Sequence, residues 1–209
     1  MRGLYAILDI DTLASSGQEP LAFAERVLRA RPAALQLRAK SLEARATLAL
    51  LGPLQVACSA ARVPLFCNDR IDLALIARAD GVHVGQHDPP VAVVRRLAPE
   101  LRVGVSTHDL EQLEAALAER PDYVAFGPVY ATQSKRNPDP VVGISTLEEA
   151  GRRCRKAGVP LVAIGGVTLE RASVVSRAAD AAAVISALYG GPGTIEERAR
   201  ALHLALGGT

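Results

Sequence analysis

Short apolar runs alternate with longer stretches of helical pattern from one end of the chain to the other. The runs are continuously apolar rather than alternating, which is typical of parallel strands covered on both faces. The pattern predicts eight strands, at 4–8, 34–38, 64–68, 81–84, 102–106, 122–127, 160–164 and 181–185. It predicts eight helices, at 20–31, 42–61, 71–78, 89–98, 109–119, 145–157, 169–178 and 195–206. This alternation indicates repeated βα units and a parallel sheet.

Eight βα units in 209 residues predict an α/β fold, a single (β/α)₈ TIM barrel domain over residues 1–209. The alternative is an open doubly wound sheet. Such sheets usually carry a glycine-rich turn after the first strand, where this chain has Asp9-Ile10-Asp11. The longest connection, at about 128–143, contains several prolines and no apolar periodicity, so we expect an active-site loop there.

Composition narrows the class of protein further. Hydrophobic residues make up 49% of the chain, with no Trp, three Phe and four Tyr, so the core must be mainly aliphatic. The net charge of +2 comes from scattered arginines without a basic stripe, which argues against a nucleic-acid partner. No apolar run reaches the roughly 18 residues that a membrane helix needs, so we expect a cytoplasmic protein. Cys58, Cys67 and Cys154 lie far apart, which predicts reduced core thiols.

Polar residues collect at the C-terminal ends of the predicted strands, where barrels of this class build their active sites. Arg38 and Lys40 lie two residues apart on one strand, so their side chains point the same way and can converge on one anion. Gln36 has the same parity and would line the same wall. The alternative for the two cations is a solvated strand end that forms ion pairs with a helix.

Asp69 and Asp88 follow neighbouring predicted strands at matching height. Two carboxylates together with ligand phosphate oxygens form the usual Mg²⁺ site, in which the ion keeps several waters and takes few protein ligands. The alternative is that each aspartate caps the helix that follows it.

The segments after predicted strands seven and eight have the features of a phosphate-binding cup. Ile164-Gly165-Gly166-Val167 and Val184-Ile185-Ser186-Ala187 would present glycine-opened backbone N–H groups and a helix start to an anion. Paired glycines also end strands for steric reasons, and that alternative stays open.

Three histidines, His83, His87 and His108, lie near the same strand ends. Three roles are open to them: metal ligand, acid–base group or hydrogen-bonding residue. No zinc-type spacing such as HExxH is present, so structural or substrate-contact roles are favoured over metal binding. The chain also lacks a GxSxG elbow and a Ser-His-Asp arrangement. These absences indicate an enzyme that needs no strong nucleophile of its own.

A set of short motifs occurs in a fixed order along the chain. They are Gln-Leu-Arg-x-Lys at 36–40, Asn-Asp-Arg at 68–70, Gly-Val-His-Val-Gly-Gln-x-Asp at 81–88, Gly-Val-Ser-Thr-His at 104–108, Gly-Pro-Val at 127–129, Thr-x-Ser-Lys at 132–135 and Ala-Ile-Gly-Gly-Val at 163–167. Together they resemble the thiamine-phosphate synthase family over nearly the whole chain. The resemblance implies a transferase that joins a pyrimidine diphosphate to a thiazole phosphate and releases pyrophosphate, with Mg²⁺ as cofactor.

The resemblance also implies roles for individual residues. The pyrimidine diphosphate would be bound by Gln36, Arg38, Lys40, Asn68, Ser106 and Lys135. Among these, Arg38, Lys40, Ser106 and Lys135 would be catalytic, and Asp69 and Asp88 would bind the metal. The thiazole phosphate would be bound by Thr132, Gln133, Ser134, Gly166, Ile185 and Ser186. The expected partners are the small-molecule substrates. Whether the protein forms a homo-oligomer is not decided by the sequence.

Two other functions compete with this one. A thiazole tautomerase of the same superfamily would handle the thiazole phosphate without joining anything to it, and it would have no need of Asn68, Asp69 and Asp88. A non-catalytic, phosphometabolite-binding barrel should have lost its charged rim residues, and this chain keeps them. Fold analogy alone would also allow an enzyme of tryptophan or pentose metabolism.

Overall fold

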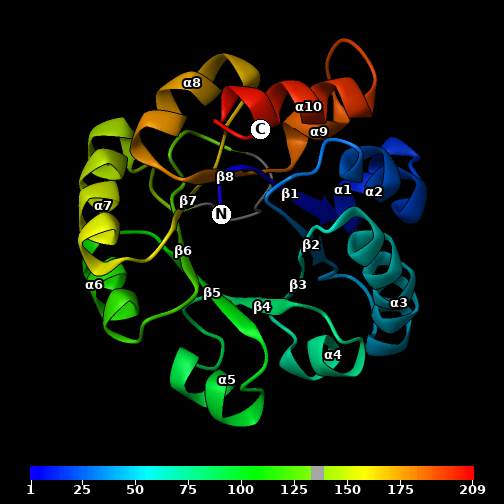
Figure 1. The fold of residues 1–209 in the computed structure, drawn as a ribbon, viewed down its shortest axis with the longest axis horizontal. Coiled ribbons are helices and arrows are strands. Elements are labelled where there is room, and N and C mark those ends of the chain that lie inside the picture. The colour runs from blue at the N-terminus through cyan, green and yellow to red at the C-terminus, as the bar shows by residue number, and fades with distance from the viewer. Residues whose placement is uncertain (133–138) are drawn as a thin grey trace.

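The structure is a computed structural model that describes residues 1–132 and 139–209. In this part of the chain eight parallel strands pair in sequence order, and β8 pairs with β1 to close the barrel (Figure 1). The helices surround the strands in Figure 1, so the chain folds as one α/β barrel domain. The barrel prediction is therefore confirmed, and the open-sheet alternative is wrong.

The strands are β1 (Gly3–Asp9), β2 (Ala34–Arg38), β3 (Leu65–Asn68), β4 (Gly81–Val84), β5 (Arg102–Thr107), β6 (Tyr123–Phe126), β7 (Leu161–Ile164) and β8 (Ala181–Val184). The described helices are α1 (Ile10–Ser16), α2 (Pro20–Leu28), α3 (Ala44–Ala61), α4 (Ile71–Ile76), α5 (Val91–Leu97), α6 (Leu110–Ala118), α7 (Gly143–Ala157), α8 (Leu169–Ala178), α9 (Ser186–Tyr189) and α10 (Ile195–Ala205). No helix in the described ranges is both long and apolar enough to cross a bilayer.

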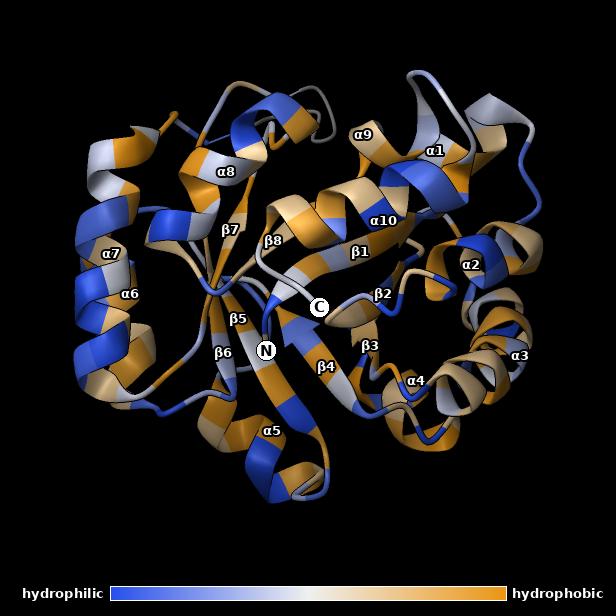
Figure 2. Ribbon diagram, turned by 45° about the horizontal axis from the view of Figure 1, so that its top comes forward, coloured by the Kyte–Doolittle hydropathy of each residue, from blue (hydrophilic) through white to orange (hydrophobic). Residues whose placement is uncertain are grey.

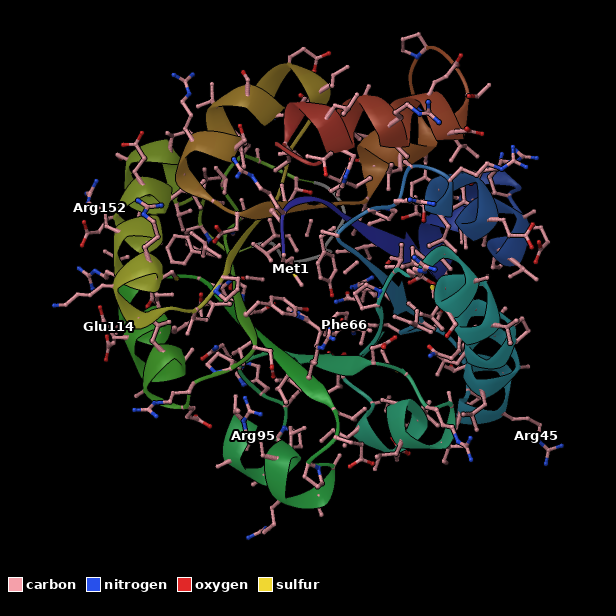
Figure 3. The ribbon with its side chains drawn as sticks, viewed as in Figure 1. Met1, Arg45, Phe66, Arg95, Glu114 and Arg152 are labelled. Atoms are coloured by element: carbon pink, nitrogen blue, oxygen red, sulfur yellow. The ribbon has the colours of Figure 1, made fainter. Side chains whose placement is uncertain are left out.

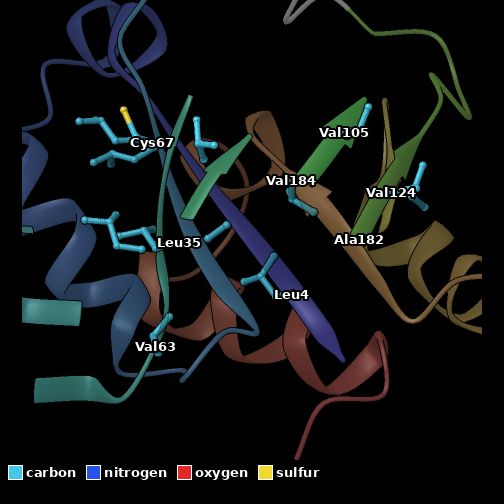
Figure 4. Packing of buried hydrophobic residues seen from close by; sticks show 14 of the residues in the cluster. Leu4, Leu35, Val63, Cys67, Val105, Val124, Ala182 and Val184 are labelled. Atoms are coloured by element: carbon cyan, nitrogen blue, oxygen red, sulfur yellow. The ribbon is translucent and has the colours of Figure 1, made fainter. Parts of the chain in front are cut away.

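Successive residues of each strand face opposite sides of the barrel wall. Along β1, Leu4, Ala6 and Leu8 belong to the large core between strands and helices, whereas Tyr5 and Ile7 belong to a smaller cluster inside the barrel. Figure 4 shows part of the large core, and Figure 2 shows that the surrounding helices, α7 most clearly, carry a polar face. The strands are therefore packed on both faces, against the helices on the outside and against the smaller cluster on the inside.

The cysteines belong to the large core. Cys58, Cys67 and Cys154 are all free and buried, as expected. Burial raises the pKa of each thiol to about 12, so these groups stay protonated at neutral pH.

The inner cluster is built from aromatic rings that lie over glycines. Phe66 pairs in register with Gly81, and Tyr123 pairs with Gly104. A Cβ atom at Gly81 would lie 2.4 Å from the Phe66 ring, and one at Gly104 would lie 2.0 Å from the Tyr123 ring. Figure 3 shows Phe66 inside the ring of strands, while labelled arginines such as Arg152 project outward from the helices. The missing side chains of the glycines make the space that these rings occupy.

Two short helices follow strands without being predicted. α1 begins directly after Asp9, whose side chain accepts hydrogen bonds from the backbone N–H and the hydroxyl of Thr12. α9 follows β8, and its Tyr189 ring stacks on Phe23 of α2 with centroids 4.5 Å apart. Both helices are too short to show a helical period in the sequence.

Gly104→Ala should destabilise the fold, because the added methyl group has no space beside the Tyr123 ring. We expect a loss of about 1–3 kcal/mol in the free energy of unfolding, measured by denaturant titration. Gly52→Ala is the matched control, since Gly52 lies within α3 with nothing within 4 Å of its Cβ position. That variant should gain up to about 1 kcal/mol from helix propensity. Equal stability of Gly104→Ala and the unmodified protein would contradict this packing.

Candidate active site

A cavity of about 460 Å³ opens at the C-terminal ends of the strands. Its lining includes residues from every strand and from both described ends of the long loop, among them Pro128, Thr132 and Asp139. Predicted site residues that line it are Gln36, Arg38, Lys40, Asn68, Asp69, Asp88, Ser106, Thr132, Gly166, Ile185 and Ser186. Gln133, Ser134 and Lys135 lie outside the described residues. The structure thus gathers the other predicted residues around one cavity.

Arg38 and Lys40 both line the cavity, and each is ion-paired with an aspartate at the end of a neighbouring strand. The Arg38 guanidinium donates to the carboxylate of Asp9, which is only 3% exposed. The Lys40 ammonium lies 3.3 Å from a carboxylate oxygen of Asp69. The ion pairs are made within the rim and not with a helix, so the helix-paired alternative is wrong.

Asp9 is a site-building residue that sequence reasoning missed. It pairs in register with Arg38 across β1 and β2, and its backbone N–H donates to the Tyr189 hydroxyl at 3.0 Å. Its carboxylate also caps α1 through Thr12. Asp9 therefore fixes the Arg38 side chain and the first turn of α1 with one buried carboxylate. The only signal in the sequence was an aspartate directly after the first apolar run.

Asp69 and Asp88 form a carboxylate pair at the ends of β3 and β4. Asp69 has φ of +62° and donates its N–H to the carbonyl oxygen of His83 at 2.8 Å, while Asp88 accepts from the Gly85 N–H at 2.7 Å. Burial raises the pKa of Asp69, the positive charge of Lys40 opposes the rise, and a hydrogen bond to Asp88 adds to it. Ionisation of Asp69 is therefore disfavoured by its burial and by the neighbouring carboxyl group.

The helix-cap alternative for these aspartates is wrong. α4 has Arg70 at its N-cap and α5 has Pro90, and no side chain caps either helix. Two hard oxygen donors held close together are the ligands that Mg²⁺ prefers. The described residues contain no group of three or more His, Cys, Asp or Glu that could hold a metal ion. Further ligands for a cation at Asp69 and Asp88 would thus come from a bound ligand or water.

The floor of the cavity is polar and buried. His83 hydrogen-bonds the Tyr123 hydroxyl through Nδ1 and the Ser106 hydroxyl through Nε2, both at 2.8 Å. The Tyr123 hydroxyl contacts that of Tyr5 at 2.7 Å, and Gln36 donates its amide to Tyr5 at 3.0 Å. Burial lowers the pKa of His83 to about 4, with Asp88 opposing the fall, so the imidazole is neutral at pH 7. Burial likewise raises the pKa of both tyrosines.

Two of the other three histidines also line the cavity. His108 hydrogen-bonds the carbonyl oxygen of Gly127 through Nδ1 at 2.7 Å, and the same nitrogen lies 3.5 Å from a carboxylate oxygen of Asp139. His87 lines the cavity beside Asp88. His83 and His108 are thus held by hydrogen bonds to protein groups.

The loop after β7 is shaped by its two glycines. Gly165 and Gly166 have φ of +96° and +63°, and a Cβ on either would lie within 2.6 Å of the segment 128–131. The Tyr130 N–H donates to the Gly165 carbonyl oxygen at 3.1 Å. Arg171 donates to the Gly166 carbonyl oxygen at 2.7 Å and lies over the Tyr130 ring at 4.4 Å. The glycines are therefore needed on steric grounds, and their phosphate role stays a prediction.

Comparison with known proteins relates the chain to one family. The profile of the family described as Thiamine monophosphate synthase matches residues 4–188. The thiamine-phosphate synthase of Anaeromyxobacter dehalogenans is 42% identical over 190 residues, covering 90% of this chain and 81% of that protein. The thiamine-phosphate synthase of Koribacter versatilis is 44% identical over 196 residues, covering 90% of each. Among solved structures, the thiamine phosphate pyrophosphorylase of Pyrococcus furiosus superposes with a TM-score of 0.86 at 28% identity, covering 98% of this chain and 95% of that one.

Asp69→Asn should stabilise the protein in the absence of divalent cations. The substitution removes a half-buried carboxyl group whose ionisation is disfavoured by burial and by the neighbouring Asp88, and asparagine tolerates a left-handed backbone well. The lost contact with Lys40 is worth little, because the Lys40 side chain is 54% exposed. We expect a melting temperature roughly 2–4 °C higher in a chelating buffer.

The matched control is Asp72→Asn. Asp72 is an exposed acid on α4 that is ion-paired with Arg70, which lowers the pKa of Asp72. This variant should show no gain in melting temperature. A lower melting temperature for Asp69→Asn than for the unmodified protein would show that the carboxylate pair is not a source of strain.

Proposed function

This chain belongs to the thiamine monophosphate synthase family, a family of transferases, and we propose that it joins 4-amino-2-methyl-5-(diphosphooxymethyl)pyrimidine to thiazole phosphate. The products would be thiamine phosphate and pyrophosphate. The observation that supports this most is the Asp69–Asp88 carboxylate pair beside Arg38 and Lys40 on the cavity rim. A diphosphate with its cation needs both kinds of group in one place.

The proposed reaction breaks the bond between the methylene carbon and the diphosphate oxygen, and the electron pair leaves with pyrophosphate. The pyrimidine ring stabilises the carbocation that remains, and the thiazole nitrogen captures it with its lone pair. Such a dissociative step depends mainly on neutralising the charge that grows on the leaving group. Arg38 and Lys40 would supply two positive charges, and Lys135 would add a third by the family resemblance.

Asp69 and Asp88 fit Mg²⁺ as the cofactor, because hard carboxylate oxygens are its preferred ligands. When bound, the ion would neutralise the diphosphate as it departs. Without a cation, burial and the neighbouring Asp88 raise the pKa of Asp69 while Lys40 opposes the rise. Lys40 would then lie where it can contact both the carboxylate pair and the leaving diphosphate.

The second substrate would bind on the opposite side of the barrel from this site (Figure 1). Gly166, Ile185 and Ser186 line the cavity at the ends of β7 and β8, with Thr132 nearby in the long loop. We propose that these residues hold the thiazole phosphate. Gln133 and Ser134 join them by the family resemblance alone.

The thiazole tautomerase remains the alternative, but no feature in the described part of the site favours it. A reaction confined to the thiazole phosphate would leave the Asp69–Asp88 pair and Arg38 without a role. A non-catalytic barrel would likewise gain nothing from a buried carboxylate pair that costs stability.

Purified protein supplied with the pyrimidine diphosphate, thiazole phosphate and Mg²⁺ should form thiamine phosphate and release pyrophosphate in equal amounts. Asp69→Asn should lower the rate by about 10²-fold or more, because the charge on the leaving group is less well neutralised. Asp72→Asn, outside the cavity, should keep the full rate. No product in the unmodified protein, or product formation that does not require Mg²⁺, would overturn the proposal.

A further inference from the structure

A continuous chain of hydrogen bonds crosses the interior of the barrel. It runs from Gln36 on β2 through Tyr5 on β1 and Tyr123 on β6 to His83 on β4, and ends at Ser106 on β5. The successive contacts measure 3.0, 2.7, 2.8 and 2.8 Å. Its two ends, Gln36 and Ser106, both line the cavity. The chain therefore links two points of the proposed pyrimidine site through Tyr5, Tyr123 and His83, which line the same cavity.

The polarity of this chain follows from the number of hydrogens available. Gln36 donates its amide hydrogen to the Tyr5 hydroxyl oxygen, so the single hydroxyl hydrogen of Tyr5 is left for Tyr123. The Tyr123 hydrogen is then given to Nδ1 of His83. An imidazole that accepts at Nδ1 carries its hydrogen on Nε2, which donates to the Ser106 oxygen.

The reverse polarity leaves a buried donor unsatisfied. If Tyr123 donated to Tyr5, the Tyr5 oxygen would accept two hydrogen bonds, and its own hydrogen would have no acceptor among the described residues. Tyr5 lies in the cavity floor but is only 1% exposed, so its hydroxyl group has almost no access to water. An unsatisfied buried donor is strongly disfavoured. With the Gln36 amide nitrogen facing Tyr5, as in this structure, the direction from Gln36 to Ser106 is the one that satisfies every group of the chain.

We propose that Tyr5, Tyr123 and His83 are positioning residues that fix the hydrogen-bonding character of both ends of the chain. Gln36 has its amide nitrogen committed to Tyr5, so it would present its carbonyl oxygen to the ligand as an acceptor. Ser106 accepts from His83, so its own hydroxyl hydrogen would be a donor. An acceptor and a donor on one wall match a ring that carries an amino group beside an unprotonated ring nitrogen.

This inference rests on the proposed function, since an aminopyrimidine is such a ring. Packing alone does not explain the two tyrosines. Both lie in the apolar cluster inside the barrel, where phenylalanine would fill the same space without burying a hydroxyl group. The buried hydroxyls are accounted for by the link that they make between Gln36 and Ser106.

The polarity can be measured without any assay of activity. In protein with ¹⁵N-labelled histidine, the ring-nitrogen shifts of the four histidines distinguish the two neutral tautomers, and His83→Gln assigns the signal. His83 should be the tautomer with hydrogen on Nε2. Hydrogen on Nδ1, or on both nitrogens, at pH 7 would overturn the inference.

The consequence for the reaction is tested with Tyr123→Phe, which removes the central link and keeps the ring. kcat/KM for the pyrimidine diphosphate should fall about 10-fold or more, while KM for the thiazole phosphate stays unchanged. Thr107→Val is the matched control, because it removes a buried hydroxyl from β5 that donates to the Ala125 carbonyl oxygen at 3.1 Å, and Thr107 itself does not line the cavity. Equal kinetics for Tyr123→Phe and Thr107→Val would overturn the positioning role.

A double variant shows whether Tyr123 acts through Ser106. In a Ser106→Ala background, Tyr123→Phe should cause a smaller fold-loss than in the unmodified protein, and independent, multiplying losses would contradict the chain. If the unmodified protein forms no thiamine phosphate, the proposed function fails and the aminopyrimidine role fails with it. The tautomer measurement still decides the polarity in that case, so the two failures are distinguishable.

Discussion

Two tyrosine hydroxyls and an imidazole are buried inside the ring of strands, at the floor of the cavity, and they hydrogen-bond one another there. That network constrains the strand register, because Tyr5, Tyr123 and His83 come from three different strands. It also constrains the neighbours of the rings. Gly104 must lack a side chain for Tyr123 to lie over it, as Gly81 must for Phe66. Closure of the barrel and the shape of the cavity floor thus depend on one set of contacts.

At the rim of the barrel, charged side chains are likewise held by partners from neighbouring strands. Asp9 holds Arg38, and Asp69 holds Lys40, so each cation is oriented before any ligand arrives. The pairs differ in burial, since Asp9 is nearly inaccessible whereas Lys40 is largely exposed. Arg38 is therefore a fixed part of the wall, and Lys40 has the freedom to change partners when a diphosphate and its cation bind.

Much of this fold could be predicted because parallel barrel strands are continuous apolar runs. Every predicted strand lies within two residues of the observed one at each end, and the predicted helices occur in order. The ends of elements were less predictable. α7 begins at Gly143, not at residue 145. Ser145 and Glu148 have the spacing of a capping box but do not cap α7, while Thr194 and Glu197 form such a box at α10. Local spacing cannot tell which of two similar motifs the backbone will use.

The site was predictable as a set of strand-end residues, but not as a network. Parity placed Gln36, Arg38 and Lys40 on one wall, and the structure puts all three at the cavity. The bond between Tyr5 and Tyr123 joins residues 118 positions apart, and no local pattern carries that information. Asp9 was not predicted as a site residue for the same reason, because its role depends on the ion pair with Arg38, a residue of another strand.

We propose that the rim has two anion sites, a cation-linked one at β2 to β4 and a separate one at β7 and β8. Isothermal titration of pyrophosphate into the protein, with and without Mg²⁺ and with and without saturating thiazole phosphate, tests that division most directly. Pyrophosphate should bind only with Mg²⁺, and with the same stoichiometry whether or not thiazole phosphate is present. Displacement of pyrophosphate by thiazole phosphate would mean that the rim has a single anion site, which would contradict the account.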